Sequence, residues 1–556
     1  MPPLERLLID YDLGLLRVIA ELWGVELGAL NQREAVNALT EALLEAGRVA
    51  RIVEALPAEA RHALEAVRHA GGRAPLASFS RTHGEVRVMG TARRDRERPW
   101  ANAPSPAEVL WYRALTGHAF FEAERGPQEF VFIPEDLLRL LPQAKAPPPP
   151  PPPGHAVEAF EVFSPAETFA ADDVTTLLAF AQTVPLKLES GTTTTRVPAT
   201  VRRFLREPAA LDLCFQLALH LELLHETPLK PNPATARAFL EQNRWAQTRA
   251  LAEAWRTSAA WNDLRRMPGL LFEGRNWRND PVSTRATLLR LLSEVPPGQW
   301  WSLDSFVAAV KERAPDFQRP AGDYDSWYIR DATTKRYLRG FEHWERVDGA
   351  LVRWLILGPL RWLGLVDVSL NKAEVEQDAF RLTPNGAAFL GARSATPAED
   401  ASAAARIHIG ANGIVRVPIG VNPYTRFRVA RITKWITLVE AEYHYRLTAS
   451  SLRRAVKQGV ALDRILEFLR GVADEHGLPP TLLGALQRWA RNGAEAAVKE
   501  TAVLKVKSAD LLETLQRTPK IKALLGPPLG PTAIEIRRDD ADRLRNLLAE
   551  LGILAD

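Results

Sequence analysis

The 556-residue sequence contains one cysteine, Cys214, and no run of about 18 or more uncharged apolar residues. A single cysteine excludes an internal disulfide and any cysteine-rich zinc or iron–sulfur site. Because Cys214 lies in the apolar stretch LDLCFQLAL, we expect a core residue rather than a nucleophile. The lack of a long apolar run predicts no transmembrane helix, and the N-terminal stretch MPPLERLLIDYD lacks the layout of a signal peptide. We therefore predict a cytoplasmic protein.

Signatures of catalysis are also missing. The dipeptide Gly-Lys does not occur, so the sequence has no phosphate-binding loop of the G-x-x-x-x-G-K-[ST] type. The tripeptide Asp474-Glu475-His476 lacks the residue that a helicase DExH box has between Glu and His, and it follows a predicted helix rather than a buried strand. We interpret Asp323 and Asp325 as a polar turn around Gly322 rather than as metal ligands. We predict a protein that is not an enzyme and binds no cofactor or metal, although a nuclease site assembled from distant carboxylates stays open.

The length predicts about three or four domains, because one hydrophobic core rarely organises so long a chain. Seven consecutive prolines, Pro147 to Pro153, predict a stiff polyproline II spacer and give the clearest boundary. The overall prediction is a multidomain, mainly helical α+β protein. Its expected parts are a helical N-terminal domain with a small β element (1–145), a proline-rich linker (146–170), a winged-helix-like domain (171–241), a tryptophan-rich second winged-helix-like domain (242–395) and a C-terminal α/β domain (404–556).

Residues 171–241 carry the first of the two predicted winged-helix-like units. Helical and apolar segments, a loop, a basic helix, a long apolar helix and a proline-rich turn follow one another in the order that this fold requires. A helix of such a domain can enter the major groove of DNA. Winged helices also serve as protein–protein modules, and that alternative stays open. The candidate DNA-facing residues here are Arg196, Arg202, Arg203 and Arg206.

Ten of the fifteen tryptophans lie between Trp245 and Trp362. Aromatic side chains can stack on unpaired bases. Aromatics spaced along helices more often fill cores and domain interfaces, so we favour packing. The ending GLVDV…FRLTPNGAAFL resembles the wing and last helix of a winged-helix unit.

The most informative stretch is YHYRLTASSLRRAVKQG, residues 443–459. Its aromatic start predicts a short strand, Thr448 is placed to cap a helix, and Gly459 is a natural helix stop. Leu452, Ala455 and Val456 define an apolar helix face, whereas Arg453, Arg454 and Lys457 define a basic one. Before this stretch we expect two strands, 407–409 and 414–419, and a helix near 427–438.

Positive charge is concentrated around this stretch. Residues 404–460 contain ten Lys and Arg against two Asp and Glu, which gives +8 in a chain whose total is +4. A local excess of this kind suits a polyanion, since neutralised phosphates release condensed counterions. A solvated basic face without a partner is the alternative.

The segment YRLTASSLRRAVKQGV and the apolar pattern that follows it resemble the helicase-associated N-terminal domain of the XPB family, with its YRLT-x-x-SL-x-x-A-x-x-xG pattern. The resemblance spans Arg406 to the C-terminus. It implies an association with DNA and with a helicase machine. The N-terminal layout, with GEVRVMG, PW, WYRAL and FIPEDLLRLLP, is similar to that of bacterial proteins that share this domain.

Together these features predict a non-catalytic, helicase-associated DNA-binding protein acting in repair, transcription or defence. The competing hypothesis is an adaptor that docks onto a separately encoded helicase or nuclease and contacts DNA little. The predicted phosphate-contacting residues at the C-terminal site are Arg446, Ser450, Arg453, Arg454 and Lys457.

Overall fold

The computed structural model describes residues 1–28, 31–123, 126–142, 151–158, 163, 168–183, 199–226, 229–274, 279–319, 322–369, 378–392, 405–493 and 501–553. Arg196 and the predicted loop around it lie outside these ranges, and so do Pro147 to Pro150 and further parts of the predicted linker 146–170. The chain divides into two compact units. The first comprises Met1–Ile407, Arg416–Arg431 and Trp435–Tyr445, and the second His408–Val415, Ile432–Lys434 and Arg446–Asp556.

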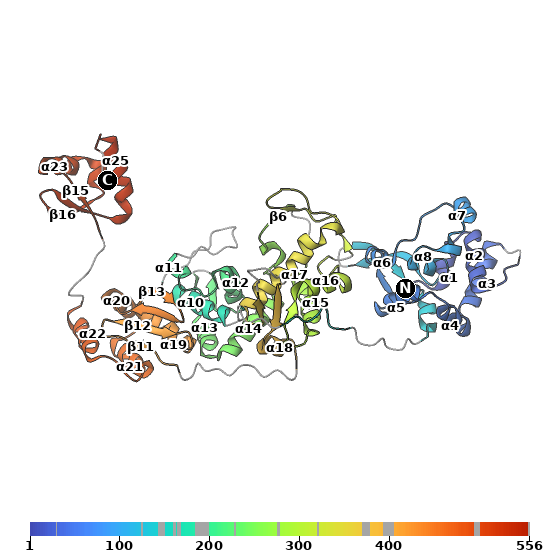
Figure 1. Ribbon diagram of the computed structural model, residues 1–556, viewed down its shortest axis with the longest axis horizontal. Helices are drawn as coiled ribbons and strands as arrows, with labels where there is room; N and C mark the ends of the chain where they lie inside the picture. Colours follow the sequence, from blue (N-terminus) through green and yellow to red (C-terminus); the bar gives the residue numbers. More distant parts are fainter. Residues whose placement is uncertain are drawn as a thin grey trace. The chain divides into compact units, whose positions relative to one another are not determined.

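Helices dominate the described residues, and the strands form small sheets (Figure 1), which confirms the predicted mainly helical α+β class. The prediction of an α/β C-terminal domain is corrected. Its last sheet, in the order β15-β17-β16, is antiparallel throughout, and short antiparallel strands need no crossover helices. These strands are β15 (Ala502–Lys505), β16 (Leu525–Gly530) and β17 (Ala533–Ile536).

The N-terminal helices follow the predicted apolar stripes, whose leucines and valines are buried. They are α1 (Leu4–Ile9), α2 (Leu13–Trp23), α3 (Gln32–Leu43), α4 (Ala46–Glu54) and α5 (Ala58–His69). A three-stranded sheet in the order β1-β3-β2 then alternates with short helices. These elements are β1 (Arg73–Pro75), α6 (Leu76–His83), α7 (Thr91–Glu97), α8 (Pro106–Trp111), β2 (Gly117–Ala123), β3 (Gly126–Phe132) and α9 (Glu135–Leu140).

The next region begins with α10 (Phe169–Thr183) and α11 (Ala199–Arg202). A second pair of helices, α12 (Leu211–His220) and α13 (Pro233–Glu241), flanks the hairpin of β4 (Leu224–Glu226) and β5 (Leu229–Pro231). Helix α12 is a core helix, because Leu213, Cys214, Phe215 and Leu217 are fully buried. The core location predicted for Cys214 is thus confirmed, and burial raises the pKa of its thiol.

The tryptophan-rich region contains a sheet in the order β7-β10-β9. Its elements are α14 (Arg244–Thr257), β6 (Leu270–Phe272), α15 (Pro281–Ser293), β7 (Trp301–Ser302), α16 (Leu303–Arg313), β8 (Ile329–Asp331), α17 (Ala350–Leu355), β9 (Val366–Ser369), β10 (Ala379–Leu382) and α18 (Pro384–Phe389). Helix α17 is continued on both sides by π-helical turns, Glu345–Gly349 and Ile356–Leu360. The preference for packing is confirmed, since Trp255, Trp261, Trp300, Trp301, Trp327, Trp344 and Trp362 are buried.

The last prolines of the run and the residues after them lie along this region. The indole of Trp301 donates a hydrogen bond to the carbonyl of Pro153 at 2.7 Å, and Arg313 donates one to Pro151 at 2.6 Å. The backbone of Val157 then donates to the carbonyl of Trp300 at 2.9 Å. Residues 151–157 are therefore anchored beside β7.

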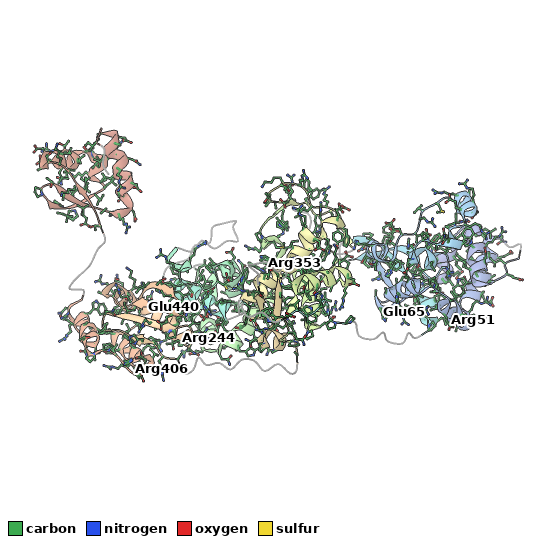
Figure 2. The ribbon with its side chains drawn as sticks, in the orientation of Figure 1. Arg51, Glu65, Arg244, Arg353, Arg406 and Glu440 are labelled. Atoms are coloured by element: carbon green, nitrogen blue, oxygen red, sulfur yellow. The ribbon has the colours of Figure 1, made fainter. Side chains whose placement is uncertain are left out.

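A four-stranded sheet has the order β11-β12-β14-β13. Its elements are β11 (His408–Ile409), β12 (Ile414–Pro418), β13 (Lys434–Val439) and β14 (Glu442–Arg446), with α19 (Pro423–Ile432) between β12 and β13. The predicted helix near 427–438 is wrong beyond Ile432. The run Trp435-Ile436-Thr437 and Val439 favours a strand over a helix. Figure 2 labels Glu440, which lies in the turn between β13 and β14.

The helices after β14 are α20 (Ala449–Lys457), α21 (Leu462–Val472) and α22 (Pro480–Asn492), followed within the last module by α23 (Ala509–Arg517), α24 (Pro519–Lys522) and α25 (Ala541–Glu550). The last module has a small core of its own, with Leu512, Leu515, Ile534, Leu544 and Leu548. Within the residues that the structure describes, none of the helices combines the length and apolar character that crossing a bilayer requires.

Candidate nucleic-acid interface

Helix α20 begins as the sequence predicts. The hydroxyl of Thr448 accepts a hydrogen bond from the backbone N–H of Ser451 at 3.1 Å, and the hydroxyl of Ser451 accepts one from the N–H of Thr448 at 3.1 Å. This reciprocal capping box satisfies two backbone donors and fixes the first turn. The helix ends at Lys457, and Gly459 adopts a positive φ of 82°.

Two hydrogen bonds and a buried apolar face hold α20 within the second compact unit. The N–H of Leu447 donates to the carbonyl of Gly413 at 2.8 Å, directly before the cap. The hydroxyl of Ser451 donates to the carbonyl of Ile432 at 2.9 Å. Leu452 and Ala455 are buried, as predicted, but Val456 is 45% exposed, so its assignment to the apolar face is wrong. The buried face of the helix is narrower than its pattern indicates.

The opposite side of α20 presents a basic face to solvent. Arg453 and Lys457 follow Ser450 by three and seven positions, so the three side chains lie along one side of the helix. All three are exposed. Arg446, the last residue of β14, is also exposed. Across the described ranges, Arg446, Arg453 and Lys457 make no ion pair with an acidic side chain. We call Arg446, Ser450, Arg453 and Lys457 the α20 basic face.

Arg454 departs from the prediction that it would be a surface cation. Its guanidinium is half-buried and donates to the carbonyl of Thr433 at 2.7 Å. Burial lowers the pKa of Arg454. Because this side chain ties α20 to the backbone before β13, Arg454 holds the helix in place. Lys434, which follows Thr433 and is exposed, is a cation that the predicted site omitted.

The predicted DNA-facing residues near α11 differ in their exposure to solvent. Arg202 and Arg203 are exposed, as a phosphate contact requires. Arg206 is not, because its guanidinium lies 2.9 Å from the buried carboxylate of Asp172 and above the ring of Phe169, with 4.8 Å to the centroid. Arg206 is therefore a structural residue, and the predicted phosphate contact is corrected. Arg196 lies outside the described residues.

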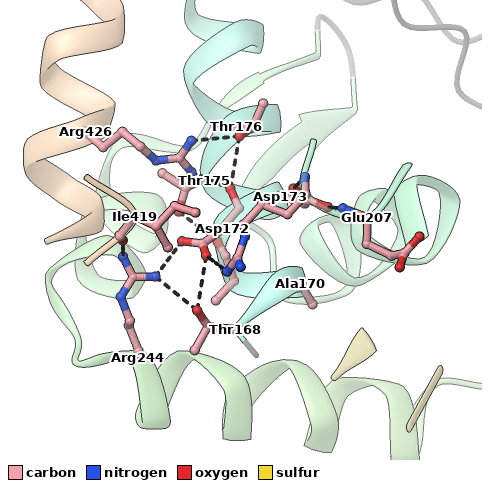
Figure 3. A network of polar contacts seen from close by, with 12 residues as sticks. Thr168, Ala170, Asp172, Asp173, Thr175, Thr176, Glu207, Arg244, Ile419 and Arg426 are labelled. Carbon is pink, nitrogen blue, oxygen red and sulfur yellow. Dashed lines mark hydrogen bonds and ion pairs between the residues drawn. The ribbon is translucent and has the colours of Figure 1, made fainter. Parts of the chain in front are cut away.

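Asp172 is the centre of a buried network in the first compact unit (Figure 3). Its side chain is 1% exposed and forms ion pairs with Arg206 and Arg244, while the hydroxyl of Thr168 donates to it at 3.1 Å. Arg244 also donates to the carbonyls of Ile419 and Val421, the latter at 2.9 Å. The Asp172–Arg244 pair thus joins α10 to the chain that follows β12.

Arg426 of α19 completes this network. It is 3% exposed and donates to the hydroxyl of Thr176 at 2.9 Å and to the backbone carbonyl of Asp172. Its guanidinium lies over the ring of Tyr443, 4.0 Å from the centroid. In Figure 3, Arg244 and Arg426 point toward the α10 helix from two different elements. We call Asp172, Arg206, Arg244 and Arg426 the Asp172 network.

Aromatic rings also pack between the α10–α11 region and the strands β13 and β14. The ring of Phe204 lies 4.8 Å from that of Trp435 and 5.4 Å from that of Tyr445, and Phe180 is 6.0 Å from Trp435. These rings join residues near α11 to β13 and β14. The 169–241 region and this part of the C-terminal region therefore share one core.

Asp173, next to Asp172, is fully buried. Its carboxylate accepts hydrogen bonds from the backbone N–H groups of Arg206 at 2.7 Å and Glu207 at 3.0 Å. Burial raises the pKa of Asp173 to about 7, and the nearby charge of Asp172 adds to the rise. The sequence offers one indication that Asp172 and Asp173 are buried, because these two adjacent acids interrupt an otherwise apolar helix.

Comparison with known families gives one result. The family described as "Helicase conserved C-terminal domain" matches residues 408–529, which include α19, α20 and the exposed α20 basic face. The match covers less than a quarter of the chain and indicates a role linked to helicases or DNA processing. No curated protein matches the chain.

Proposed function

We propose that this protein is a non-catalytic DNA-binding factor that acts with a helicase-containing machine in repair, transcription or defence. The observation that carries the proposal is the α20 basic face. Arg453 and Lys457 stand on a capped helix, and Arg446 ends the strand before it. All three cations are exposed and make no ion pair with an acid among the described residues. Phosphates are the partners that such an arrangement favours.

The family comparison supports the link to helicases, and the motif YRLTASSLRRAVKQG supports the finer proposal that the domain is of the XPB type. We further propose winged-helix folds for the regions 171–241 and 242–395. The sheet order β7-β10-β9, with two helices between β7 and β9, supports this assignment in the second region. The N-terminal sheet order β1-β3-β2 supports a third such unit.

Contacts to phosphates position a protein on DNA but carry little sequence information. The proposed binding is therefore sensitive to salt and weakly selective for sequence. The test is the triple variant Arg446→Gln, Arg453→Gln and Lys457→Gln, titrated with fluorescent duplex DNA by anisotropy over a range of salt concentrations. If all three cations contact phosphates, the slope of log K against log salt falls in magnitude by about 2 to 3.

The matched control is the variant Arg464→Gln, because Arg464 is an exposed cation in the same unit whose charge Glu467 already compensates at 3.2 Å. Arg454 is left unchanged in the triple variant, since its loss would disturb the position of α20. The proposal fails if the triple variant keeps the wild-type slope. It also fails if the wild-type protein does not bind duplex DNA at low salt.

A protein-interaction adaptor is the second candidate. It is favoured by Ile436 and Val439, which are 37% and 45% exposed on β13, the last strand in the sheet order. Exposed apolar residues on an edge strand suit a protein partner that adds a strand. Affinity purification after nuclease treatment separates the candidates. An adaptor retains a separate helicase or nuclease subunit, and the double variant Ile436→Thr with Val439→Thr loses it.

A further inference from the structure

Two exposed tyrosines and two half-buried arginines cluster at β8 and the turn that follows it. Arg330 lies on β8, Tyr328 directly precedes this strand, and Tyr337 and Arg339 follow it in the chain. Strands β6 and β8 pair antiparallel, with Leu271 opposite Arg330, and the backbone of Arg330 forms a further bridge to Tyr337. The side chains of Tyr328 and Tyr337 are 45% and 40% exposed, so neither ring is buried in the core. We call Tyr328, Arg330, Tyr337 and Arg339 the tyrosine–arginine patch.

The patch is ordered by its own contacts. The two tyrosine rings meet edge to face, with 6.2 Å between centroids. The guanidinium of Arg330 lies 4.2 Å from the ring centroid of Tyr337, and that of Arg339 lies 4.3 Å from that of Tyr328. The hydroxyl of Tyr337 donates to Glu273 at 2.8 Å. These contacts hold both rings in place before any ligand arrives, which lowers the entropic cost of binding.

Within the patch, Arg330 forms an ion pair with Glu273 at 3.0 Å, and further cations lie close to the patch in the chain. Residues 326–340 contain four Lys and Arg against one acid, and that acid, Asp331, pairs with Arg346. Lys335 and Arg336, in the turn after β8, are exposed. Within the parts of the chain that the structure covers, Lys335, Arg336 and Arg339 form no ion pair. Their charges are available to an anionic partner.

We propose that the tyrosine–arginine patch binds single-stranded nucleic acid, with bases stacked on Tyr328 and Tyr337 and phosphates held by Lys335, Arg336 and Arg339. Proteins that bind single strands combine aromatic rings, on which bases stack, with cations that contact the phosphates. A duplex hides the faces of its bases in the stack, so it could engage the cations only. Deoxyribose and ribose strands present the same bases and phosphates, and the patch chemistry serves both.

The test uses the full-length protein and three fluorescent oligomers of equal length: oligothymidylate, oligouridylate and an abasic deoxyribose-phosphate chain. The double variant Tyr328→Leu with Tyr337→Leu removes the rings and keeps apolar side chains. We expect it to bind oligothymidylate at least about fivefold more weakly than wild type does, with an unchanged salt slope. Its affinity for the abasic chain should equal that of wild type.

Phe120→Leu is the matched control, because Phe120 is likewise an exposed aromatic, 70% exposed on β2, and lies outside the patch. It should leave all three affinities unchanged, and the thermal unfolding of each variant shows that it is folded. The oligouridylate arm reports whether ribose strands bind as well. The inference is overturned if the double variant binds oligothymidylate as wild type does, or if wild type binds the abasic chain equally tightly.

The inference stands apart from the proposed function, so each experiment can fail alone. The triple variant of the α20 basic face changes duplex binding and its salt slope, whereas the tyrosine variant changes the preference for bases over an abasic chain. Repeating the oligothymidylate titration in the triple-variant background should give the same fold loss on removing the tyrosines. A loss that disappears in this background contradicts an independent site.

Discussion

Replacing Asp172 by Asn tests whether the Asp172 network holds the 169–241 region and α19 in one core. The substitution preserves shape and leaves no cavity, but it removes the carboxylate charge with which Arg206 and Arg244 both pair. Both guanidiniums are largely buried, with side chains 9% and 12% exposed. Breaking a buried ion pair by removing one partner costs about 3–5 kcal/mol.

In a protein of several domains, one global unfolding energy is not well defined, so a local measurement is needed. Hydrogen exchange followed by mass spectrometry reports the opening of α10 and α19 separately. A cost of about 3–5 kcal/mol corresponds to exchange about two to four orders of magnitude faster for protected amides in both helices. The last module, with its own core, should exchange as in wild type.

The matched control is Asp542→Asn, which breaks the exposed pair with Arg545, where the Asp542 side chain is 94% exposed. Exposed pairs contribute about 0–1 kcal/mol, so its exchange should change less than about fivefold. Equal exchange in α10 and α19 for the two variants would refute the structural role assigned to Asp172. Faster exchange in α10 alone would refute the claim that the network joins α10 to α19.

Two further predictions follow from other buried contacts. The raised pKa of Asp173, about 7, means that the folded protein keeps a proton that the unfolded chain releases near pH 4. The contribution of Asp173 to stability therefore falls as the pH rises from about 4 to 7. Asp173→Asn should remove this contribution, so the thermal unfolding midpoint of wild type should decline relative to that of the variant across this range, and a constant difference between the two midpoints would contradict the assignment. The double variant Trp301→Phe with Arg313→Met removes the hydrogen-bond donors to the carbonyls of Pro153 and Pro151. The backbone amide of Val157 should then exchange its hydrogen about tenfold faster or more. Unchanged exchange at Val157 would mean that these hydrogen bonds do not anchor residues 151–157.

Local features of the candidate site could be predicted from the sequence because they depend on neighbouring residues. The cap at Thr448, the stop near Gly459 and the burial of Leu452 and Ala455 all arise within one helix. The core position of Cys214 follows from an apolar stretch in the same way.

The burial of charged residues could not be predicted in this way. Arg206, Arg426 and Arg454 carry the same sequence signal as exposed cations, and they differ only in what lies beside them after folding. Arg426 donates to Thr176, which is 250 positions away in the chain. The net charge of residues 404–460 therefore overstates the charge that faces solvent. The helix predicted near 427–438 failed for a related reason, since no glycine or proline marks the change to β13.

The claim that the α20 basic face binds DNA is tested most directly by salt-titrated anisotropy of wild type and the Arg446→Gln, Arg453→Gln, Lys457→Gln variant on the same duplex. The account predicts that wild type binds with a slope of several phosphates and that the variant's slope is smaller in magnitude by about 2 to 3. Identical slopes for the two proteins would contradict it.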